Sequence, residues 1–178
     1  DSITCTTTKP STLLTTPKFS VERREYDIPG KGIVRRELVV HPGAVLIVPM
    51  LSPDTVVMIY NRRFAVDAEL LELPAGTLDE GESPEDCARR EVREETGMAA
   101  GKMEFIGGFY LAPGYSTEYL QVYLARDLHE DPLEADADEF LTMERIPATA
   151  ALEMCARGLL PDAKTLAALL LARVRLEI

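Results

Sequence analysis

The sequence predicts an α+β fold, a mixed sandwich with helices on both faces of a sheet. Strand-like segments fill the first part of the chain, one well-marked helix lies in the middle, and two helical segments come last. The 178 residues are enough for one domain with a substantial core. We therefore expect a single domain over 18–178, with an N-terminal hairpin at 19–40 and the core at 41–178.

The N-terminal segment divides into a tail and a hairpin. Residues 1–17 are rich in Thr and Ser and show no period, which indicates a flexible tail. "FSVERREYDI" (19–28) alternates between apolar and polar residues, and "PGKG" (29–32) is typical of a turn. "IVRRELVV" (33–40) reads as the returning strand, so 19–40 is predicted to be a β-hairpin.

The core begins with two continuous apolar runs, "AVLIVPML" (44–51) and "TVVMIY" (55–60), which are typical of buried strands. A short strand is predicted within 69–76. The helix at 84–96 is bounded by a capping Ser83 and a terminating Gly97. Further strands are expected near 102–111, 118–125 and 140–145, and further helices at 147–157 and 161–175.

Composition and charge exclude some classes of function. The formal net charge of −11 argues against a nucleic-acid surface, which normally needs a basic patch. No apolar run reaches the roughly 18 residues of a membrane span, and no signal peptide is visible. The three cysteines are far apart and fit neither a disulfide framework nor a zinc spacing. We therefore expect a cytoplasmic protein that binds neither nucleic acid nor membrane.

Glu91, Glu94 and Glu95 crowd the C-terminal end of the central helix, where the helix dipole disfavours negative charge. At about 100° per residue they share one arc with the small residues Cys87 and Ala88. A solvated face is the ordinary explanation for charged runs, but the opposite side of this helix already supplies one. Arg90 can pair with one carboxylate but hardly with all three. A divalent cation resolves the excess charge, and carboxylates suit Mg²⁺ or Mn²⁺.

The same stretch resembles the Nudix box, G-x5-E-x7-R-E-U-x-E-E-x-G-U with U apolar. It matches at every defined position, namely Gly76, Glu82, Arg90, Glu91, Val92, Glu94, Glu95, Gly97 and Met98. The resemblance implies an α/β/α sandwich on a mixed sheet and hydrolysis of a nucleoside diphosphate linked to another moiety. It also implies that Glu91, Glu95 and the backbone carbonyl of Ala75 bind Mg²⁺. Glu94 is then a direct or water-mediated ligand, and Arg90 orients the carboxylates.

The flanking segments resemble the ADP-ribose pyrophosphatase subfamily. "LAPGYSTE" (111–118) places Pro113 fifteen residues after Met98, although Ala112 and Thr117 depart from the subfamily pattern. "YNRRFAVDAELLELPAGTLDEGE" (60–82) resembles the segment that leads into the box, where an Arg and a Glu contact substrate. A plain Pro-Gly turn and a surface arginine are the alternatives. The resemblance implies substrate contacts from Arg63, Glu72, Pro113, Gly114 and Glu118.

The acidic loop 134–144 resembles the late loop that supplies another carboxylate to the subfamily's site. The preferred alignment puts Glu139 on that acid and Ala137 where several relatives have the general base. The base is therefore left open between residues of this loop, Glu94 and Glu118, and a solvated acidic loop is the alternative.

Together these resemblances imply Mg²⁺-dependent hydrolysis of ADP-ribose to AMP and ribose 5-phosphate. The implied catalytic residues are Glu94, Glu139 and Arg90. They also imply a homodimer, with N-terminal hairpins that can be exchanged between subunits. The alternatives are a pyrophosphatase for another sugar nucleotide or a dinucleotide, a non-catalytic nucleotide-sensing Nudix module and, more remotely, a structural or interaction protein.

Overall fold

The structure is a computed structural model, and it describes all residues except 1–5, 8–9, 134–140 and 177–178. The chain forms two compact units. The first comprises 1–43 and 110–119, and the second comprises 44–109 and 120–178. Residues 110–119, which we expected within the core segment 41–178, thus group with the N-terminal hairpin.

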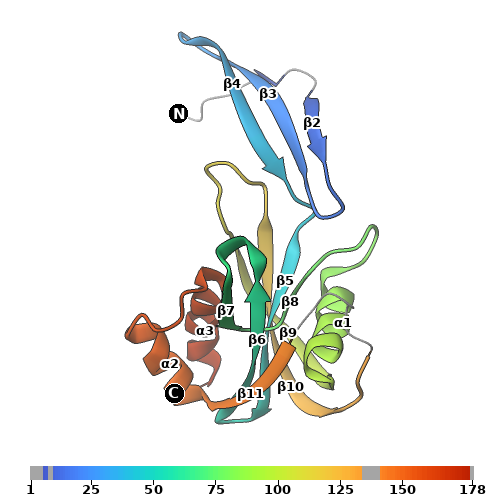
Figure 1. The fold of residues 1–178 in the computed structure, drawn as a ribbon, viewed down its shortest axis with the longest axis vertical. Helices are drawn as coiled ribbons and strands as arrows, with labels where there is room; N and C mark the ends of the chain where they lie inside the picture. Colours follow the sequence, from blue (N-terminus) through green and yellow to red (C-terminus); the bar gives the residue numbers. More distant parts are fainter. Residues whose placement is uncertain (1–5, 8–9, 134–140, 177–178) are drawn as a thin grey trace. The chain divides into compact units, whose positions relative to one another are not determined.

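The first unit is an antiparallel sheet around a long hairpin (Figure 1). Strands β3 (Ser20–Ile28) and β4 (Gly32–Val40) pair along their whole length, as the sequence predicts. Strands β1 (Thr6–Thr7) and β2 (Ser11–Thr15) pair with the other edge of β3. The expected flexible tail is therefore wrong for Ser11–Thr15. Threonine is β-branched and favours extended backbone, and the edge of β3 offers hydrogen-bond partners.

This first unit has little interior. Every side chain of β2, β3 and β4 is at least partly exposed. The segment 110–119 joins it through Val39, whose N–H donates to the Tyr115 carbonyl at 2.8 Å and whose carbonyl accepts from Thr117 N at 2.9 Å. The rings of Tyr110 and Tyr119 meet edge to face at 5.0 Å.

The second unit is built on a mixed sheet in which the strand order is β11-β6-β5-β10-β9. The central strand β5 (Ala44–Ser52) is parallel to β10 (Tyr119–Glu130) and antiparallel to β6 (Thr55–Arg63). The remaining strands are β7 (Ala68–Glu72) beside β6, β8 (Ala75–Thr77) beside β5, β9 (Met98–Tyr110) and β11 (Leu141–Pro147). A single 3₁₀ turn, η1 (Phe64–Val66), follows β6.

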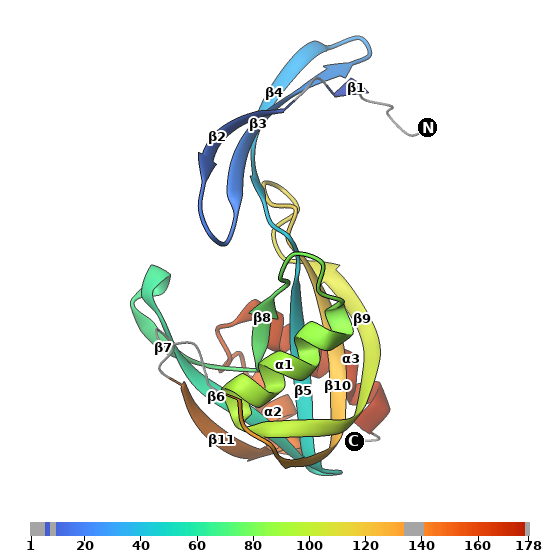
Figure 2. The same cartoon turned by 90° about the vertical axis from the view of Figure 1, so that its right-hand side faces the viewer.

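Helices cover both faces of this sheet. Alternate residues of β5 point to opposite faces. Val45 and Ile47 pack against α1 (Pro84–Thr96), whereas Leu46 and Val48 belong to the cluster formed with α2 (Ala148–Ala156) and α3 (Ala163–Leu176). Figure 2 shows α1 in front of β5 and β10, with α2 and α3 behind them. The predicted α/β/α arrangement is confirmed.

The two cysteines that the structure describes lie in the core of the second unit. Cys87 and Cys155 are free and buried, as expected of small core residues. Over the part of the chain that the structure describes, no helix combines the length and apolar character needed to cross a membrane.

Candidate active site

The site is built on α1, whose ends are fixed by local sequence. Ser83 Oγ accepts a hydrogen bond from Asp86 N at 3.1 Å, and Pro84 occupies the first helical position, where no N–H is needed. Gly97 ends the helix at φ 70°, and its N–H donates to the Arg93 carbonyl at 2.9 Å. These boundaries set which residues of the helix face the sheet.

Glu91 and Glu95 lie on the buried side of α1. They are 8% and 6% exposed, and they share that side with Cys87, Ala88 and Val92, all 0% exposed. The predicted helical arc is therefore confirmed, and Glu94 lies at its partly exposed margin. Both buried carboxylates are directed at strand β8.

Strand β8 lies directly against these two carboxylates. The N–H of Ala75 donates to Glu95 Oε2 at 2.9 Å. At Gly76 the contact is closer still, because a Cβ there would lie 1.7 Å from Glu91 Oε1. Only glycine leaves room for the Glu91 side chain, which gives a physical reason for glycine at the first position of the motif.

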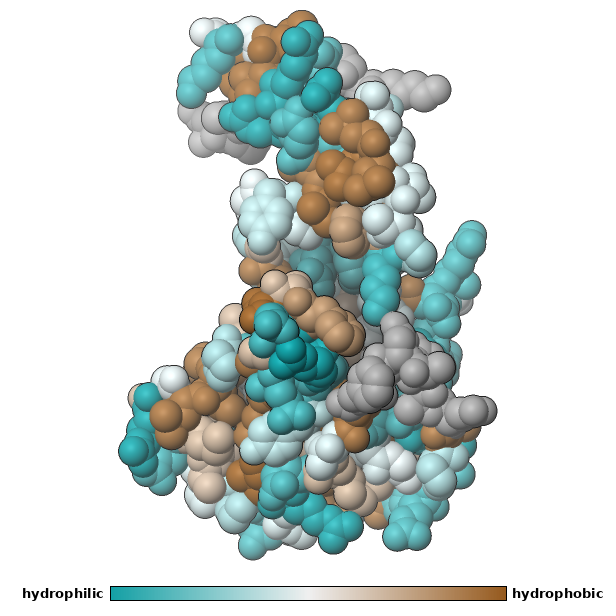
Figure 3. All heavy atoms as spheres, viewed as in Figure 1, coloured by the Kyte–Doolittle hydropathy of each residue, from teal (hydrophilic) through white to brown (hydrophobic). Residues whose placement is uncertain are grey.

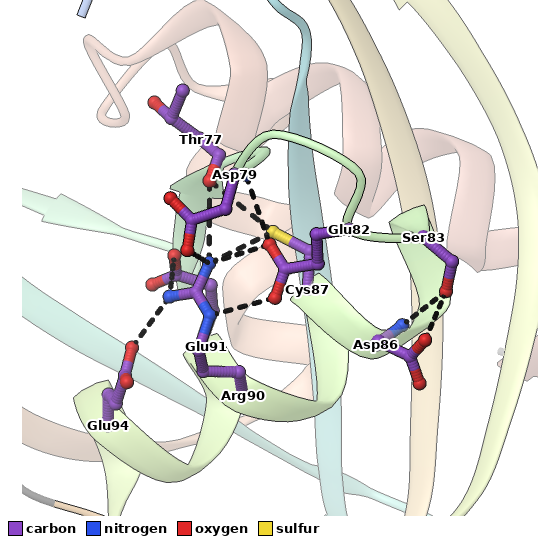
Figure 4. A network of polar contacts seen from close by, with 9 residues as sticks. All are labelled: Thr77, Asp79, Glu82, Ser83, Asp86, Cys87, Arg90, Glu91 and Glu94. Atoms are coloured by element: carbon purple, nitrogen blue, oxygen red, sulfur yellow. Dashed lines mark hydrogen bonds and ion pairs between the residues drawn. The ribbon is translucent and has the colours of Figure 1, made fainter. Parts of the chain in front are cut away.

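Arg90 holds several acidic side chains together (Figure 4). Its Nε and Nη2 donate to the two oxygens of Glu82 at 2.9 and 3.0 Å. Its Nη1 donates to Glu91 Oε1 at 2.7 Å and to Glu94 Oε2 at 2.9 Å. Arg90 thus contacts two of the three clustered glutamates, more than the single pairing that we expected.

These contacts change the acidity of the groups involved. The hydrogen bonds from Arg90, above all, lower the pKa of Glu82 to about 2. Conversely, the hydrogen bond with Glu82 raises the pKa of Arg90 most, and the charge of Glu91 and the hydrogen bonds with Glu91 and Glu94 act in the same direction. Burial raises the pKa of the neighbouring Cys87 thiol, which therefore stays protonated. Glu82 therefore stays ionised beside the permanent cation of Arg90.

A second ionic cluster lies at the end of β7. Arg63 donates from Nε to Glu72 Oε1 at 2.9 Å and from Nη2 to Glu72 Oε2 at 2.6 Å. Lys164 Nζ also donates to Glu72 Oε2, at 2.5 Å. Glu72 is only 1% exposed, whereas 38% of the Arg63 side chain is exposed. The structure thus brings Arg63 and Glu72 together and shows that Arg63 is the accessible member of the pair.

Sequence reasoning missed Lys164 and its neighbour Asp162, which are 14% and 13% exposed at the side chain. A signal was nevertheless present, because a lysine in the first turn of a helix opposes the helix dipole.

Three further expected site residues, Pro113, Gly114 and Glu118, belong to the first unit. Pro113 and Gly114 lie in a turn closed by Tyr115 N and Ser116 N, which both donate to the Ala112 carbonyl. Glu118 follows this turn, and its N–H donates to Ser116 Oγ at 3.1 Å. Glu139 and Ala137 lie outside the described residues, so their roles remain predictions.

The donors on α1 suit a hard cation such as Mg²⁺. Among the residues that the structure describes, no three His, Cys, Asp or Glu side chains are grouped closely enough to form a metal site by themselves. Mg²⁺, however, commonly takes only one or two carboxylates and completes its shell with water and substrate phosphates. Glu91 and Glu95 beside β8 fit that pattern, with the substrate supplying further oxygens.

Comparison with known proteins adds independent information on the family. The family model described as NUDIX domain matches residues 40–169. An ADP-ribose pyrophosphatase of Mycobacterium tuberculosis (strain ATCC 25618 / H37Rv) is 40% identical over 150 residues, which cover 83% of this chain and 72% of the relative. An ADP-ribose pyrophosphatase of Bacillus subtilis (strain 168) is 36% identical over 143 residues, covering 79% of this chain and 77% of the relative.

Two further similarities extend this set. A solved structure described as an ADP compounds hydrolase superposes with a TM-score of 0.83 at 27% identity, covering 99% of this chain and 97% of the other. A protein of Enterobacter sp. (strain 638), named GDP-mannose pyrophosphatase, is 32% identical over 164 residues, which cover 83% of this chain and 84% of the relative.

Proposed function

Because the chain belongs to the Nudix family and is a Nudix hydrolase, we propose that it cleaves the pyrophosphate bond of ADP-ribose to give AMP and ribose 5-phosphate. Pyrophosphatase activity on ADP-ribose or a related sugar nucleotide is supported by relatives at 36–40% identity that are named for ADP-ribose. The observation that carries the proposal is the pair of buried carboxylates, Glu91 and Glu95, placed against Ala75 and Gly76.

We propose Mg²⁺, with Mn²⁺ as a substitute, as the cofactor. Glu91, Glu95 and the backbone carbonyl of Ala75 would hold it, with Glu94 as a direct or water-mediated ligand. When bound, such a cation neutralises charge on the pyrophosphate and lowers the pKa of a coordinated water. The position of these two buried carboxylates beside β8 supports this assignment, because carboxylate oxygens are the hard ligands that Mg²⁺ takes in proteins.

The protein's own side chains position the substrate and stabilise charge, which are the main requirements of phosphoryl transfer. Arg90 keeps Glu91 and Glu94 in place through two hydrogen bonds from one nitrogen. The Arg63 side chain is 38% exposed and has N–H donors that Glu72 does not use, and we assign these donors to a phosphate of the substrate. Glu139 is proposed as the late acidic residue, and the general base stays open among the acidic loop, Glu94 and Glu118.

Further substrate contacts are proposed for Pro113, Gly114 and Glu118, on the resemblance of their segment to the subfamily motif. A homodimer is proposed because the strands of the first unit expose apolar side chains, including Leu14 and Ile33. We propose a cytoplasmic location because Cys87 and Cys155 are free and buried, and thiols stay reduced in the cytoplasm.

A second candidate is the same chemistry on another sugar nucleotide, which is favoured by the relatives named GDP-mannose pyrophosphatase. A module that binds nucleotide without turnover is a third, and the buried carboxylate pair argues against it because binding alone does not require those carboxylates.

The decisive experiment is product analysis. Purified protein is incubated with ADP-ribose and Mg²⁺, with and without EDTA, and products are separated by chromatography. AMP and ribose 5-phosphate are expected only with free metal. A parallel panel of GDP- and UDP-sugars and dinucleotides ranks kcat/KM. Faster turnover of another nucleotide would replace ADP-ribose, and binding without products would support the sensing module.

The metal assignment is tested with a matched pair of variants on α1. Glu95→Gln should abolish turnover, because it removes a charged ligand while keeping shape. Glu85→Gln is the control, since Glu85 lies on the same helix but pairs with Arg89 on its exposed side. Turnover that survives Glu95→Gln largely intact would show the metal assignment to be wrong.

A further inference from the structure

The helix α3 begins with a cation in an unfavourable place. Lys164 is the second residue of the helix, where the partial positive charge of the N-terminus favours anions. Its side chain is only 14% exposed. Ordering a long flexible side chain and removing its charge from water both cost free energy. The contacts of Lys164 therefore need to offset the costs of ordering and desolvation. The partners in these contacts indicate the role of the residue.

Lys164 is held from its own helix and directed at another element. Its Nζ forms an ion pair with Asp162 Oδ1 at 2.9 Å. Asp162 Oδ2 accepts from Thr165 N at 3.0 Å and so caps the helix. The same Nζ donates to Glu72 Oε2 at 2.5 Å, across to the end of β7. A second contact ties the same two elements, because Leu73 N donates to Thr165 Oγ1 at 2.9 Å.

Glu72 links Lys164 to Arg63. It is 1% exposed, and its two oxygens accept hydrogen bonds from Arg63 and Lys164. A side chain so buried has almost no surface for a substrate. Two cations from different elements hold the Glu72 carboxylate. It is therefore fixed more firmly than a carboxylate paired with a single arginine, because a rotation would break contacts with both partners.

Arg63 is the exposed end of this chain of contacts. The contact with Glu72 uses two of the five guanidinium N–H donors, and 38% of the side chain is exposed. The hydrogen bond with Glu72 raises the pKa of Arg63, and the charges of Glu95 and Asp162 act in the same direction.

We propose that Lys164 is a positioning residue which, with Asp162, fixes the Glu72 carboxylate and thereby orients the Arg63 guanidinium to bind a phosphate of the nucleotide. This inference rests on the proposed function and deepens it. It assigns Glu72 a role through Arg63, in place of the direct substrate contact implied by the family resemblance.

The test is a double-mutant cycle in the full-length protein. Lys164→Met removes the charge and keeps the stem, and Arg63→Ala removes the proposed phosphate contact. If Arg63 binds the ground state and the transition state alike, Lys164→Met should raise KM about fivefold to tenfold with kcat changed less than about twofold. Arg63→Ala should raise KM further, and the double variant should match Arg63→Ala alone, because coupled residues are non-additive.

Matched variants separate positioning from general stability. Lys102→Met is the control, because Lys102 pairs with Asp127 on the surface and its side chain is 75% exposed. It should leave KM unchanged. Glu72→Gln provides a second route if Lys164→Met does not fold, and it should also raise KM without adding to Arg63→Ala. Additive effects in the cycle, or a KM for Lys164→Met equal to that of Lys102→Met, would overturn the proposal.

A readout independent of turnover separates this inference from the proposed function. In ¹⁵N-labelled protein, the Nε–H resonance of Arg63, identified by its loss in Arg63→Ala, should exchange slowly with water. It should broaden or exchange faster in Lys164→Met. Absence of turnover on every nucleotide would refute the proposed function, whereas an unchanged Arg63 resonance in Lys164→Met would refute the positioning role.

Discussion

At Gly76 the space that a side chain would need is already occupied by the carboxylate of Glu91. A Cβ would lie 1.7 Å from Oε1 and 1.8 Å from Cδ of Glu91. Because the Glu91 side chain is buried on the side of α1 that faces β8, it has little room to move away. Glycine at this position therefore follows from packing around a proposed metal ligand.

Gly76→Ala should reduce turnover at least about tenfold and destabilise the fold by about 1–3 kcal/mol, the usual cost of overpacking. Activity and thermal unfolding would be measured together. The same substitution is then made in a Glu91→Ala variant, in which the Glu91 carboxylate no longer fills the space beside residue 76. In that variant Gly76→Ala should destabilise the fold much less. An equal loss of stability in both backgrounds would contradict the steric explanation.

Glu82 gives a residue-scale prediction for pH. Hydrogen bonds from Arg90 lower the pKa of Glu82 from 4.5 to about 2 in the folded protein. A group whose pKa is depressed by folding stabilises the fold above its unfolded pKa, and this stabilisation is lost as pH falls through the folded value. The window of loss therefore runs from about pH 5 downwards to about pH 2.

The Glu82→Gln variant should accordingly be less stable than the parent at pH 7, with a gap that shrinks as the pH falls from 5 to 3. Urea unfolding at several pH values measures this gap. Gln keeps the shape but not the charge, so the comparison isolates ionisation. A gap that stays constant over that range would show that Glu82 contributes by packing alone.

At the scale of the element, α1 depends on Ser83 for its start. Ser83→Ala should destabilise the protein by about 1 kcal/mol, since loss of an N-cap typically costs that much. For a chain of this length the expected fall in Tm is about 2–4 °C. Calorimetry measures it, and Ser83→Asp should restore most of it. Ser83→Ala without any fall in Tm would refute the capping role.

Turnover at 25 °C should be nearly unchanged in Ser83→Ala. Glu91 is eight residues beyond the cap, a distance of about 12 Å along the helix axis. A tenfold fall in kcat would mean that fraying at the N-terminus of α1 displaces the carboxylates of Glu91 and Glu95.

The elements differ in how far sequence predicts them. The limits of α1 and the buried face carrying Glu91 and Glu95 follow from caps and helical period, both local properties, and both were predicted. Strand β2 was not predicted, because a threonine-rich stretch becomes a strand only where an edge such as that of β3 is available. The contact of Lys164 with Glu72 joins residues 92 positions apart, which no local pattern encodes.

At the scale of the whole molecule, the two units bury apolar surface unequally. The apolar clusters of buried residues, as far as the structure describes them, consist of residues of the second unit. In the first unit Leu13, Leu14 and Ile33 are 46%, 52% and 65% exposed. Figure 3 shows apolar surface, in brown, on this unit. Apolar side chains that stay exposed contribute little to stability, so a second copy of the chain is the proposed cover.

The chain should therefore run as a dimer of twice its 19.7 kDa mass in size-exclusion chromatography with light scattering. Leu14→Asp places a charge on the exposed apolar surface of the first unit and should shift the protein to monomer at micromolar concentration. Val174→Asp is the matched control, because Val174 is 83% exposed on α3 of the second unit, and it should stay dimeric. A parent protein that is monomeric at all concentrations would refute the dimer. Dissociation of both variants alike would place the interface elsewhere than on the N-terminal sheet.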